Sequence, residues 1–130
     1  MIVVDASVLA VALADDGVAG NRARTMLRGD ELAAPELIDL EVLSVVRKQY
    51  SIGALDGRRA ELALRDLTDL PLQRAAHVTL IDRCWELRDN LTAYDAAYVA
   101  LAEALGAKLL TADSGIAGAA GIRCSVTLLD

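Results

Sequence analysis

Four acidic residues of this chain lie in apolar surroundings, where charged side chains are uncommon. Asp5 follows three aliphatic residues in MIVVDAS, and Asp113 follows the apolar run AKLLTA. Glu41 and Asp95 lie in helical patterns with no Lys or Arg three or four positions away. Because an unpaired buried charge is costly, each carboxylate needs hydrogen bonds, a cation or a solvent-filled cleft. The four together indicate a site that depends on a bound cation.

Most of the other acidic residues have ordinary surface explanations. Glu61, for example, has Arg58 and Arg65 within one helical turn, which is typical of solvated ion pairs. Asp39 is an exception, because it also lacks a cationic neighbour. The helical pattern alone therefore does not choose between Asp39 and Glu41 as the site residue of this segment.

Each member of the group also has a simpler role open to it. Asp5 and Asp113 precede helical segments and could act as N-caps. Asp95 follows Thr92 at the spacing of a capping box. All of these simpler roles would have to hold at once to remove the site, so the group carries more weight than any member.

Converging carboxylates repel one another, and a divalent cation would offset that repulsion. Oxygen ligands without His or Cys favour Mg²⁺ or Mn²⁺ over zinc. The single histidine, His77, has no evident nucleophile beside it and is interpreted as structural. Nothing in the sequence supports Ser7 as a nucleophile, so the pattern favours metal-dependent chemistry.

Short β-like runs alternate with longer helical runs along the chain. Strands are expected at residues 1–4, 31–35, 70–73, 107–112 and 125–129, and helices at 7–14, 21–28, 36–50, 57–67, 78–90 and 93–105. Strands separated by helices imply right-handed crossovers and a mainly parallel sheet covered on both faces. Such sheets keep their sites beyond the carboxyl ends of the strands, near a topological switch. Asp5 and Asp113 both follow predicted strands and are expected at that edge.

Length and composition fit one α/β domain over residues 1–130. Hydrophobic residues make up 55% of the chain and aromatics 3%, with no Phe, so the core must be aliphatic. The net charge of −6 argues against a broad nonspecific nucleic-acid surface, although RNA could still be held through metal ions and local arginines. Cys84 and Cys124 form no metal or redox motif, and no apolar run reaches bilayer length. We therefore expect a cytoplasmic protein with no membrane contact.

Three segments resemble the PIN-domain family, most closely the VapC-type toxins of VapBC toxin–antitoxin systems. They are MIVVDAS, the P-x5-E pattern of PELIDLEVLSVVRK, and LTAYDAAYVALAEALGAKLLTAD. Their order and spacing cover essentially the whole chain. The resemblance implies a three-layer α/β/α fold around a mainly parallel sheet of four or five strands. It also selects Glu41 over Asp39, because the family's glutamate falls on Glu41.

The resemblance implies a metal-dependent endoribonuclease. Asp5, Glu41, Asp95 and Asp113 would then be the catalytic and metal-binding residues, with Mg²⁺ as the cofactor and Mn²⁺ as a possible substitute. Metal-activated water would attack the RNA phosphodiester and leave 5′-phosphate and 3′-hydroxyl ends. The small hydroxyl positions of the family fall on two further residues that would support the site, Ser7 and Thr111.

The resemblance also implies partners. It predicts a homodimer and a cognate VapB-type antitoxin that blocks the acidic cleft, often with a basic side chain. Tyr94, beside Asp95, is the substrate-binding residue we would test first, because unpaired RNA bases stack on aromatic rings. Arg47 with Lys48 is one basic group that could guide RNA, and Arg22, Arg24 and Arg28 form another. A solvated helix face is the simpler interpretation of any single one of these basic residues.

Two other classes of function remain open at this point. The chain could be a non-cleaving PIN-fold module that binds RNA or protein, although an intact acidic quartet counts against this. It could also be a phosphotransfer protein with Asp5 as nucleophile. The haloacid-dehalogenase pattern needs a second Asp two residues later, where this chain has Ser7, and a receiver-type site needs a late Lys, to which Lys108 is a poor match.

Overall fold

The fold is built around one five-stranded parallel sheet. A computed structural model describes residues 1–130. The strands are β1 (Ile2–Val4), β2 (Leu32–Pro35), β3 (Leu72–Ala75), β4 (Lys108–Thr111) and β5 (Val126–Leu128). They lie in the order β3-β2-β1-β4-β5, and every pairing is parallel. The predicted α/β class with a parallel sheet of four or five strands is confirmed.

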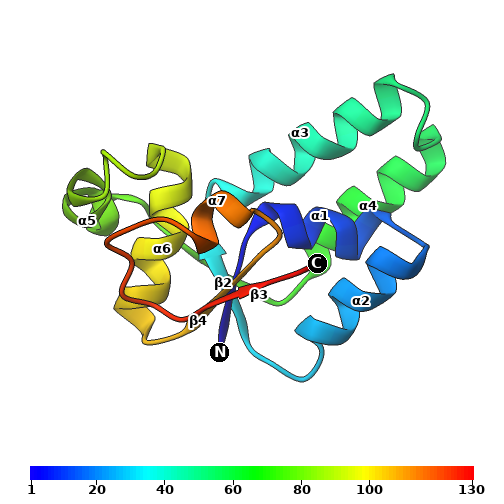
Figure 1. Cartoon of the computed structure of the whole chain (residues 1–130). Coiled ribbons are helices and arrows are strands. Elements are labelled where there is room, and N and C mark those ends of the chain that lie inside the picture. Colours follow the sequence, from blue (N-terminus) through cyan, green and yellow to red (C-terminus); the bar gives the residue numbers. More distant parts are fainter.

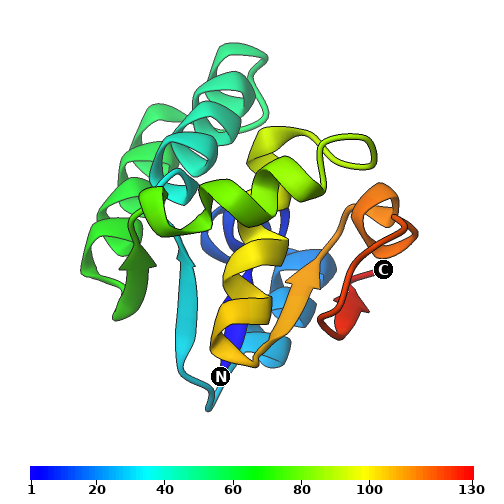
Figure 2. The same cartoon turned by 90° about the vertical axis from the view of Figure 1, so that its left-hand side faces the viewer.

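Helices cover both faces of this sheet. They are α1 (Ala6–Ala14), α2 (Val18–Leu27), α3 (Ile38–Ser51), α4 (Gly57–Asp69), the short 3-10 helix η1 (Val78–Leu80), α5 (Ile81–Glu86), α6 (Ala93–Leu105) and α7 (Ser114–Ala117). Figure 1 shows α5 and α6 on one side of the sheet and α1, α2 and α4 on the other. Seen from the side, α6 crosses in front of the central strands (Figure 2). None of these helices combines the length and the apolar character needed to cross a bilayer.

The core is aliphatic, as a sequence without Phe requires. A single cluster of buried Ala, Val, Leu and Ile side chains runs from Ile2 to Ile116. Its one aromatic member is Tyr98, which is 0% exposed and is the largest of the fully buried side chains. The other aromatic residues are all exposed. The hydroxyl of Tyr98 therefore lies in a mainly aliphatic interior, whose other buried polar side chains are Asp5 and Thr111.

The topological switch lies between β1 and β4. The chain moves from β1 to β2 and β3 in one direction, then returns to place β4 on the other side of β1. Ile2 pairs with Lys108 and Val4 with Leu110, so the two strands end level with each other. Crossovers that leave in opposite directions open a crevice beyond such strand ends. Asp5 and the residues after Thr111 lie at this crevice.

Several element boundaries differ from the sequence prediction. The second helix starts earlier, at Val18, and β3 starts later, at Leu72, because Pro71 has no amide to donate to the ladder. The third helix starts at Ile38, because Pro35 ends β2 and the amide of Leu37 donates to His77 Nε2 at 3.0 Å. This bond gives His77 the structural role that the sequence analysis assigned to it.

The predicted helix at 78–90 is largely wrong in its second half. It is a 3-10 turn followed by α5, which ends at Glu86. Arg88 donates to the carbonyl of Trp85 at 2.9 Å and lies over the indole ring, 4.4 Å from its centroid. Asn90 donates to Ala120. After Glu86 the chain continues in turns, in which the amide of Arg88 donates to Trp85 and the amide of Asn90 to Leu87. The short α7 is not among the helices whose ranges were predicted, although Asp113 was considered as the N-cap of a following helix.

Candidate active site

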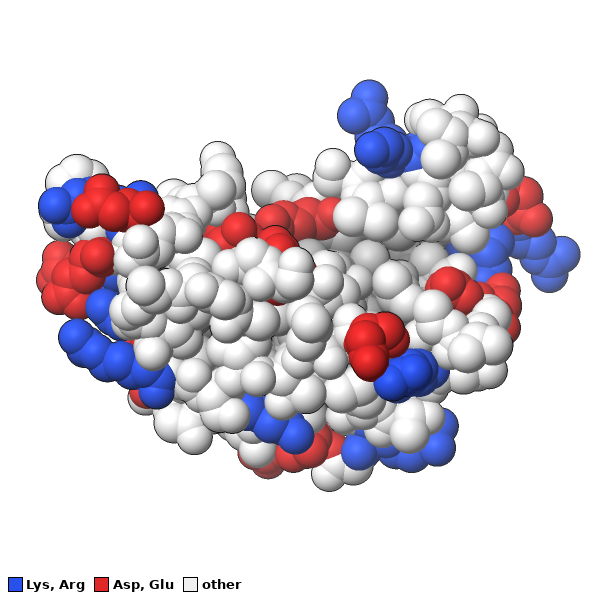
Figure 3. Space-filling view, in the orientation of Figure 1, with Lys and Arg blue, Asp and Glu red and all other residues white.

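The four acidic residues singled out from the sequence line one pocket of about 350 Å³. Asp5 links β1 to α1, Glu41 and Asp95 lie in the first turns of α3 and α6, and Asp113 precedes α7. The rest of the lining comes from α1, with Ala6 and Ser7, and from α3, with Ser44 and Val45. In Figure 3 acidic side chains gather in a hollow below α3 and beside α7, surrounded by uncharged surface. Four distant segments thus bring carboxylates together without an arginine or lysine in the lining.

Two hydroxyl groups fix the side chain of Asp5, which is 6% exposed. Ser7 Oγ donates to Asp5 Oδ2 at 2.8 Å, and Thr111 Oγ1 donates to the same oxygen at 2.7 Å. No protein group donates to Oδ1. One oxygen of this carboxylate is therefore held, and the other is left for a ligand in the pocket.

The same hydroxyls clasp the two strand ends together. Ser7 Oγ accepts from the amide of Ala112 at 3.1 Å, and Thr111 Oγ1 accepts from the amide of Asp113 at 3.0 Å. Each hydroxyl donates to Asp5 and accepts from the segment after β4, so a short network of hydrogen bonds sets the spacing between Asp5 and Asp113. Ser7 commits its proton to Asp5, which fits a supporting group better than a nucleophile.

Glu41 is held from the opposite side of the pocket. The hydroxyl of Tyr98 donates to Glu41 Oε1 at 2.6 Å, a distance typical of a charge-assisted bond. Burial, the bond to Glu41 and the charges of Glu41 and Asp5 raise the pKa of Tyr98, while the backbone of Ala6 acts in the opposite direction. The tyrosine thus stays protonated and remains a donor.

Mutual repulsion is visible in the electrostatics of the pocket. Burial and the charges of Asp5 and Asp95 raise the pKa of Glu41 above its ordinary value, against the hydrogen bond from Tyr98. Burial and the charges of Asp5 and Asp113 likewise raise the pKa of Asp95. Nearby carboxylates disfavour each other's charged form unless a cation compensates. In the folded protein the charged forms of Glu41 and Asp95 are therefore disfavoured, because no cationic side chain lines the pocket.

The simpler capping roles are partly present and do not exhaust these residues. Thr92 accepts from the amide of Asp95 at 3.2 Å and so caps α6, and its side chain partly offsets the rise in the pKa of Asp95. Asp113 Oδ1 accepts from the amide of Gly115 at 2.8 Å, so it does cap α7. Asp5 occupies the N-cap position of α1, but its side chain makes no capping bond. Capping therefore occupies at most one oxygen of each of these carboxylates and leaves the other available to a ligand.

Asp39 has a cationic partner that lies on another element and not on its own helix. Arg74, at the neighbouring strand β3, donates to both Asp39 oxygens through Nε and Nη2 at 2.8–3.0 Å. Its charge is compensated, and it does not line the acidic pocket. The geometry thus separates Asp39 from Glu41, two residues apart on the same helix.

The pocket fits a hard divalent cation by its donor chemistry. Its charged ligands are all carboxylates, which suit Mg²⁺ and Mn²⁺ rather than zinc. The oxygens are not yet assembled around one point, because no three His, Cys, Asp or Glu side chains are arranged to hold an ion as they stand. Mg²⁺ commonly keeps several waters and few direct protein ligands, so it does not require such a closed cage.

Comparison with known proteins places the chain. The PIN-domain family model matches residues 2–122. The chain belongs to the PIN-domain family. Ribonuclease VapC9 of Mycobacterium tuberculosis is 42% identical over 99% of this chain and 98% of its own length, and Ribonuclease VapC1 of the same species is 40% identical over 98% and 96%. The resemblance noted in the sequence is confirmed.

Solved structures support the PIN fold independently. Mycobacterium tuberculosis VapC20, described as a Sarcin-Ricin loop cleaving toxin, superimposes with a TM-score of 0.72 at 15% identity, covering 95% of this chain and 97% of that one. PAE2754 from Pyrobaculum aerophilum gives 0.70 at 23% identity, covering 96% and 81%. At these identities the likeness concerns the fold.

The predicted substrate-binding residues of this PIN domain lie near the surface. Tyr94 is 66% exposed at the start of α6, and Arg47 is exposed on α3. Two members of the other basic group have structural partners: Arg22 pairs with Asp130 at 2.7 Å, and Arg24 donates to the carbonyl of Ala12 at 2.9 Å. The side chains of Tyr94 and Arg47 make no hydrogen bond or ion pair within the protein, and their role in substrate binding stays a prediction.

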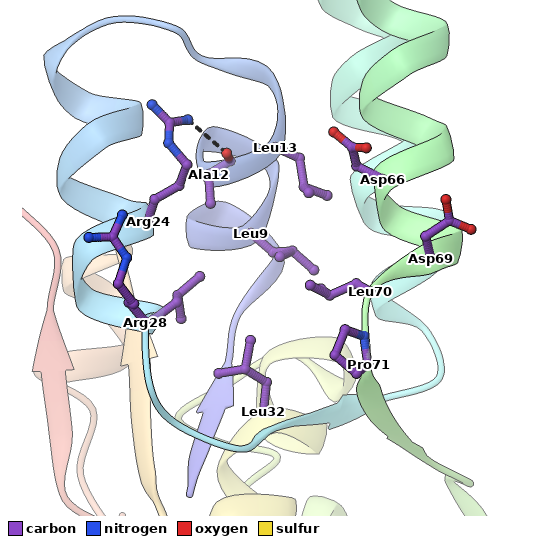
Figure 4. A pocket seen from close by; sticks show the side chains of 11 residues that line it. Leu9, Ala12, Leu13, Arg24, Arg28, Leu32, Asp66, Asp69, Leu70 and Pro71 are labelled. Atoms are coloured by element: carbon purple, nitrogen blue, oxygen red, sulfur yellow. Dashed lines mark hydrogen bonds between the residues drawn. The ribbon is translucent and has the colours of Figure 1, made fainter.

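A second hollow of about 550 Å³ lies on this PIN domain between α1, α2 and α4 (Figure 4). Leucine side chains form its floor, with Arg24 and Arg28 on the α2 side and Asp66 and Asp69 on the α4 side. Its acidic residues face arginines across an apolar gap instead of crowding one another.

Proposed function

We propose that this protein is a Mg²⁺-dependent endoribonuclease toxin of a type II toxin–antitoxin system. The observation that carries the proposal is the pocket in which Asp5, Glu41, Asp95 and Asp113 converge without a cationic side chain. Family membership and VapC ribonuclease relatives at about two-fifths identity support the same activity.

In this proposal the four carboxylates hold the cation, directly or through water. A bound Mg²⁺ supplies an activated water and stabilises charge on the phosphoryl oxygens. Ser7 and Thr111 keep Asp5 in one orientation, and Tyr98 does the same for Glu41. Mn²⁺ is the expected substitute, because it prefers the same oxygen ligands.

RNA is the proposed substrate, cleaved to leave 5′-phosphate and 3′-hydroxyl ends. Tyr94 would stack on an unpaired base and Arg47 would contact a phosphate. We expect Tyr94→Ala to weaken RNA binding while leaving divalent-ion binding unchanged, which filter binding and calorimetry can measure separately. Loss of ion binding in this variant would contradict the assignment.

The direct test compares Asp5→Asn with a matched control. Structured RNA is incubated with Mg²⁺ and with wild type, Asp5→Asn or Asp82→Asn, an exposed acid on α5. We expect Asp5→Asn to lose about 100-fold or more of the cleavage rate and Asp82→Asn to cleave normally. Equal cleavage by Asp5→Asn and wild type would refute the site, and RNA binding without cleavage by wild type would favour a non-cleaving module.

The proposed antitoxin is a VapB-type protein made in the same cytoplasm. A basic side chain entering the pocket would compensate the repulsion among its carboxylates and displace the cation. The thiols of Cys84 and Cys124 are free, which suits a reducing compartment. Inhibition by the antitoxin should weaken as ionic strength rises if this charge pairing matters.

A homodimer is the proposed assembly. Val78, Ile81 and Trp85 are 76%, 58% and 66% exposed around η1 and α5, and burying such side chains favours association. Light scattering of the free protein should give twice the 13.7 kDa of one chain. A single-chain mass at every concentration would contradict it.

A further inference from the structure

The hydroxyl of Tyr98 is the only side-chain group that fixes Glu41. Glu41 receives one hydrogen bond, from Tyr98 to Oε1, and no backbone amide or other side chain reaches its carboxylate. A glutamate has several rotatable bonds, so without that donor its head group could occupy more than one orientation. Asp5, by comparison, has two donors on a shorter side chain.

The position of Tyr98 makes an incidental contact a poor explanation. A buried tyrosine hydroxyl needs a hydrogen-bond partner, and an aliphatic core has no other use for one. This chain contains no Phe, and its single buried aromatic is placed so that the hydroxyl meets an acid of the pocket from another layer, 57 positions away. Removing the hydroxyl would leave a packed ring but no donor.

A common pattern links three of the pocket carboxylates. Each has one oxygen bonded within the protein, namely Asp5 Oδ2, Glu41 Oε1 and Asp113 Oδ1. The second oxygen of each receives no protein donor. Tyr98 also lies three positions after Asp95, so one face of α6 delivers both a carboxylate and the hydroxyl to this site.

We propose that Tyr98 is a positioning residue, whose hydroxyl holds Glu41 Oε1 and thereby presents Oε2 to the divalent cation. The inference rests on the proposed function, because it assigns Tyr98 a role toward the same cation. Tyr98 contacts neither substrate nor cation and acts only through Glu41.

The first test compares Tyr98→Phe with Tyr50→Phe. Both substitutions remove one hydroxyl, but Tyr50 is 56% exposed at the end of α3 and outside the pocket. Calorimetric titration with Mn²⁺ should show about 10-fold weaker binding for Tyr98→Phe, the scale of losing a group that orients a metal ligand, and wild-type binding for Tyr50→Phe. A folded Tyr98→Phe chain, judged by circular dichroism, that binds Mn²⁺ as wild type does would overturn the proposal.

A double-mutant cycle identifies the route of the effect. In a Glu41→Gln background, Tyr98→Phe should cause little further loss of Mn²⁺ affinity, because the ligand that it orients is already gone. A full additional 10-fold loss in that background would show that Tyr98 acts elsewhere and would overturn the proposal.

A third measurement does not depend on how well Tyr98→Phe folds. The chain has three tyrosines, so labelling the ring carbon that bears the hydroxyl gives three NMR signals. The signal of Tyr98 should shift on Glu41→Gln and again when Mg²⁺ is added to wild type. A chemical shift of Tyr98 that stays unchanged when Mg²⁺ is added would overturn the inference.

The outcomes separate this inference from the proposed function. If wild type binds no divalent cation, the proposed function fails and this inference fails with it. If wild type binds Mn²⁺ and cleaves RNA while Tyr98→Phe equals it in both, only the inference fails.

Discussion

Two partly buried glutamates lie at opposite ends of α6, Glu41 contacting it from α3 and Glu103 belonging to its last turn, and their environments differ sharply. Glu41 packs near the first turn of this helix with one neutral donor and two acidic neighbours, and the balance raises its pKa. Glu103, near the last turn, accepts from Arg83 at 2.7 and 3.2 Å and from the amide of Arg123 at 2.7 Å. Burial works to raise the pKa of Glu103, but these donors and the arginine charges outweigh it and hold the pKa below its ordinary value.

The contrast separates what stabilises this fold from what equips it for chemistry. The Arg83–Glu103 pair connects α5, α6 and the segment before β5, so its charges reinforce the packing. The carboxylates around Glu41 oppose the packing, and only an external cation would compensate them. Retained repulsion of this kind is characteristic of functional sites.

The largest expected effect comes from neutralising Glu41. Glu41→Gln should lower the RNA cleavage rate by about 100-fold or more, because a carboxylate ligand is lost, while the chain stays at least as stable as wild type, because one repelling charge is removed. Cleavage assays paired with urea unfolding measure both quantities. Glu61→Gln, an exposed acid of α4, is the control. Unchanged cleavage by Glu41→Gln would contradict a catalytic role for the region around Glu41.

Neutralising Glu103 should give the opposite result. Glu103→Gln should retain wild-type cleavage and lose about 2 kcal/mol of unfolding free energy, because Arg83 keeps a half-buried charge with a weaker acceptor. Denaturant midpoints and initial cleavage rates test this. A stable but inactive Glu103→Gln chain would mean that the two regions are not separate.

Divalent cations should raise the unfolding free energy through the pocket around Glu41 and not through the Arg83–Glu103 pair. Mg²⁺ at about ten times its dissociation constant should raise the unfolding free energy of wild type by about 1.4 kcal/mol, because it binds the folded state. The gain should disappear in Glu41→Gln and persist in Glu103→Gln. Thermal unfolding with and without Mg²⁺ checks this, and an equal gain in all three chains would point to another binding site.

The smallest expected effect concerns pH. Glu103 has a lowered folded pKa, so its contribution to stability is present above its ordinary value near 4.5 and is lost as pH falls through the folded value. Glu41 has a raised folded pKa, so its cost is present above that value and is relieved on acidification. The stability gap between wild type and Glu103→Gln should therefore narrow from about pH 7 to about pH 3. A constant gap in urea titrations would contradict the assignment.

Much of the fold could be predicted because the decisive signals are local. Asp56 caps α4 through the amide of Arg59, Thr92 caps α6, and Gly106 ends α6 in the left-handed conformation at φ 61°, each within a few residues of its helix. Asp5 and Asp113 were found because they follow apolar strands, and Glu41 and Asp95 because no cation lies within one helical turn of them. Such patterns are visible in sequence spacing alone. The choice of Glu41 over Asp39 came from the family resemblance and not from local spacing.

Partners across the fold could not be predicted in this way. Arg74 reaches Asp39 from 35 positions away, and Tyr98 reaches Glu41 from 57. The three-residue spacing of Asp95 and Tyr98 was visible, but nothing local showed that a hydroxyl would meet Glu41. The end of α5 at Glu86 was also missed. Near this end Arg83 and Asn90 donate to the carbonyl groups of Gly121 and Ala120, which lie far along the chain.

The clasp between β1 and β4 also has a consequence for biosynthesis. Asp5 is held by Thr111, 106 positions later in the chain. A nascent polypeptide emerging from the ribosome exposes Asp5 early, yet it lacks this restraint and Asp113 until most of its length has been translated. A product that ends before Thr111 therefore has Asp5 without its Thr111 partner and without Asp113, so the acidic pocket cannot assemble in it.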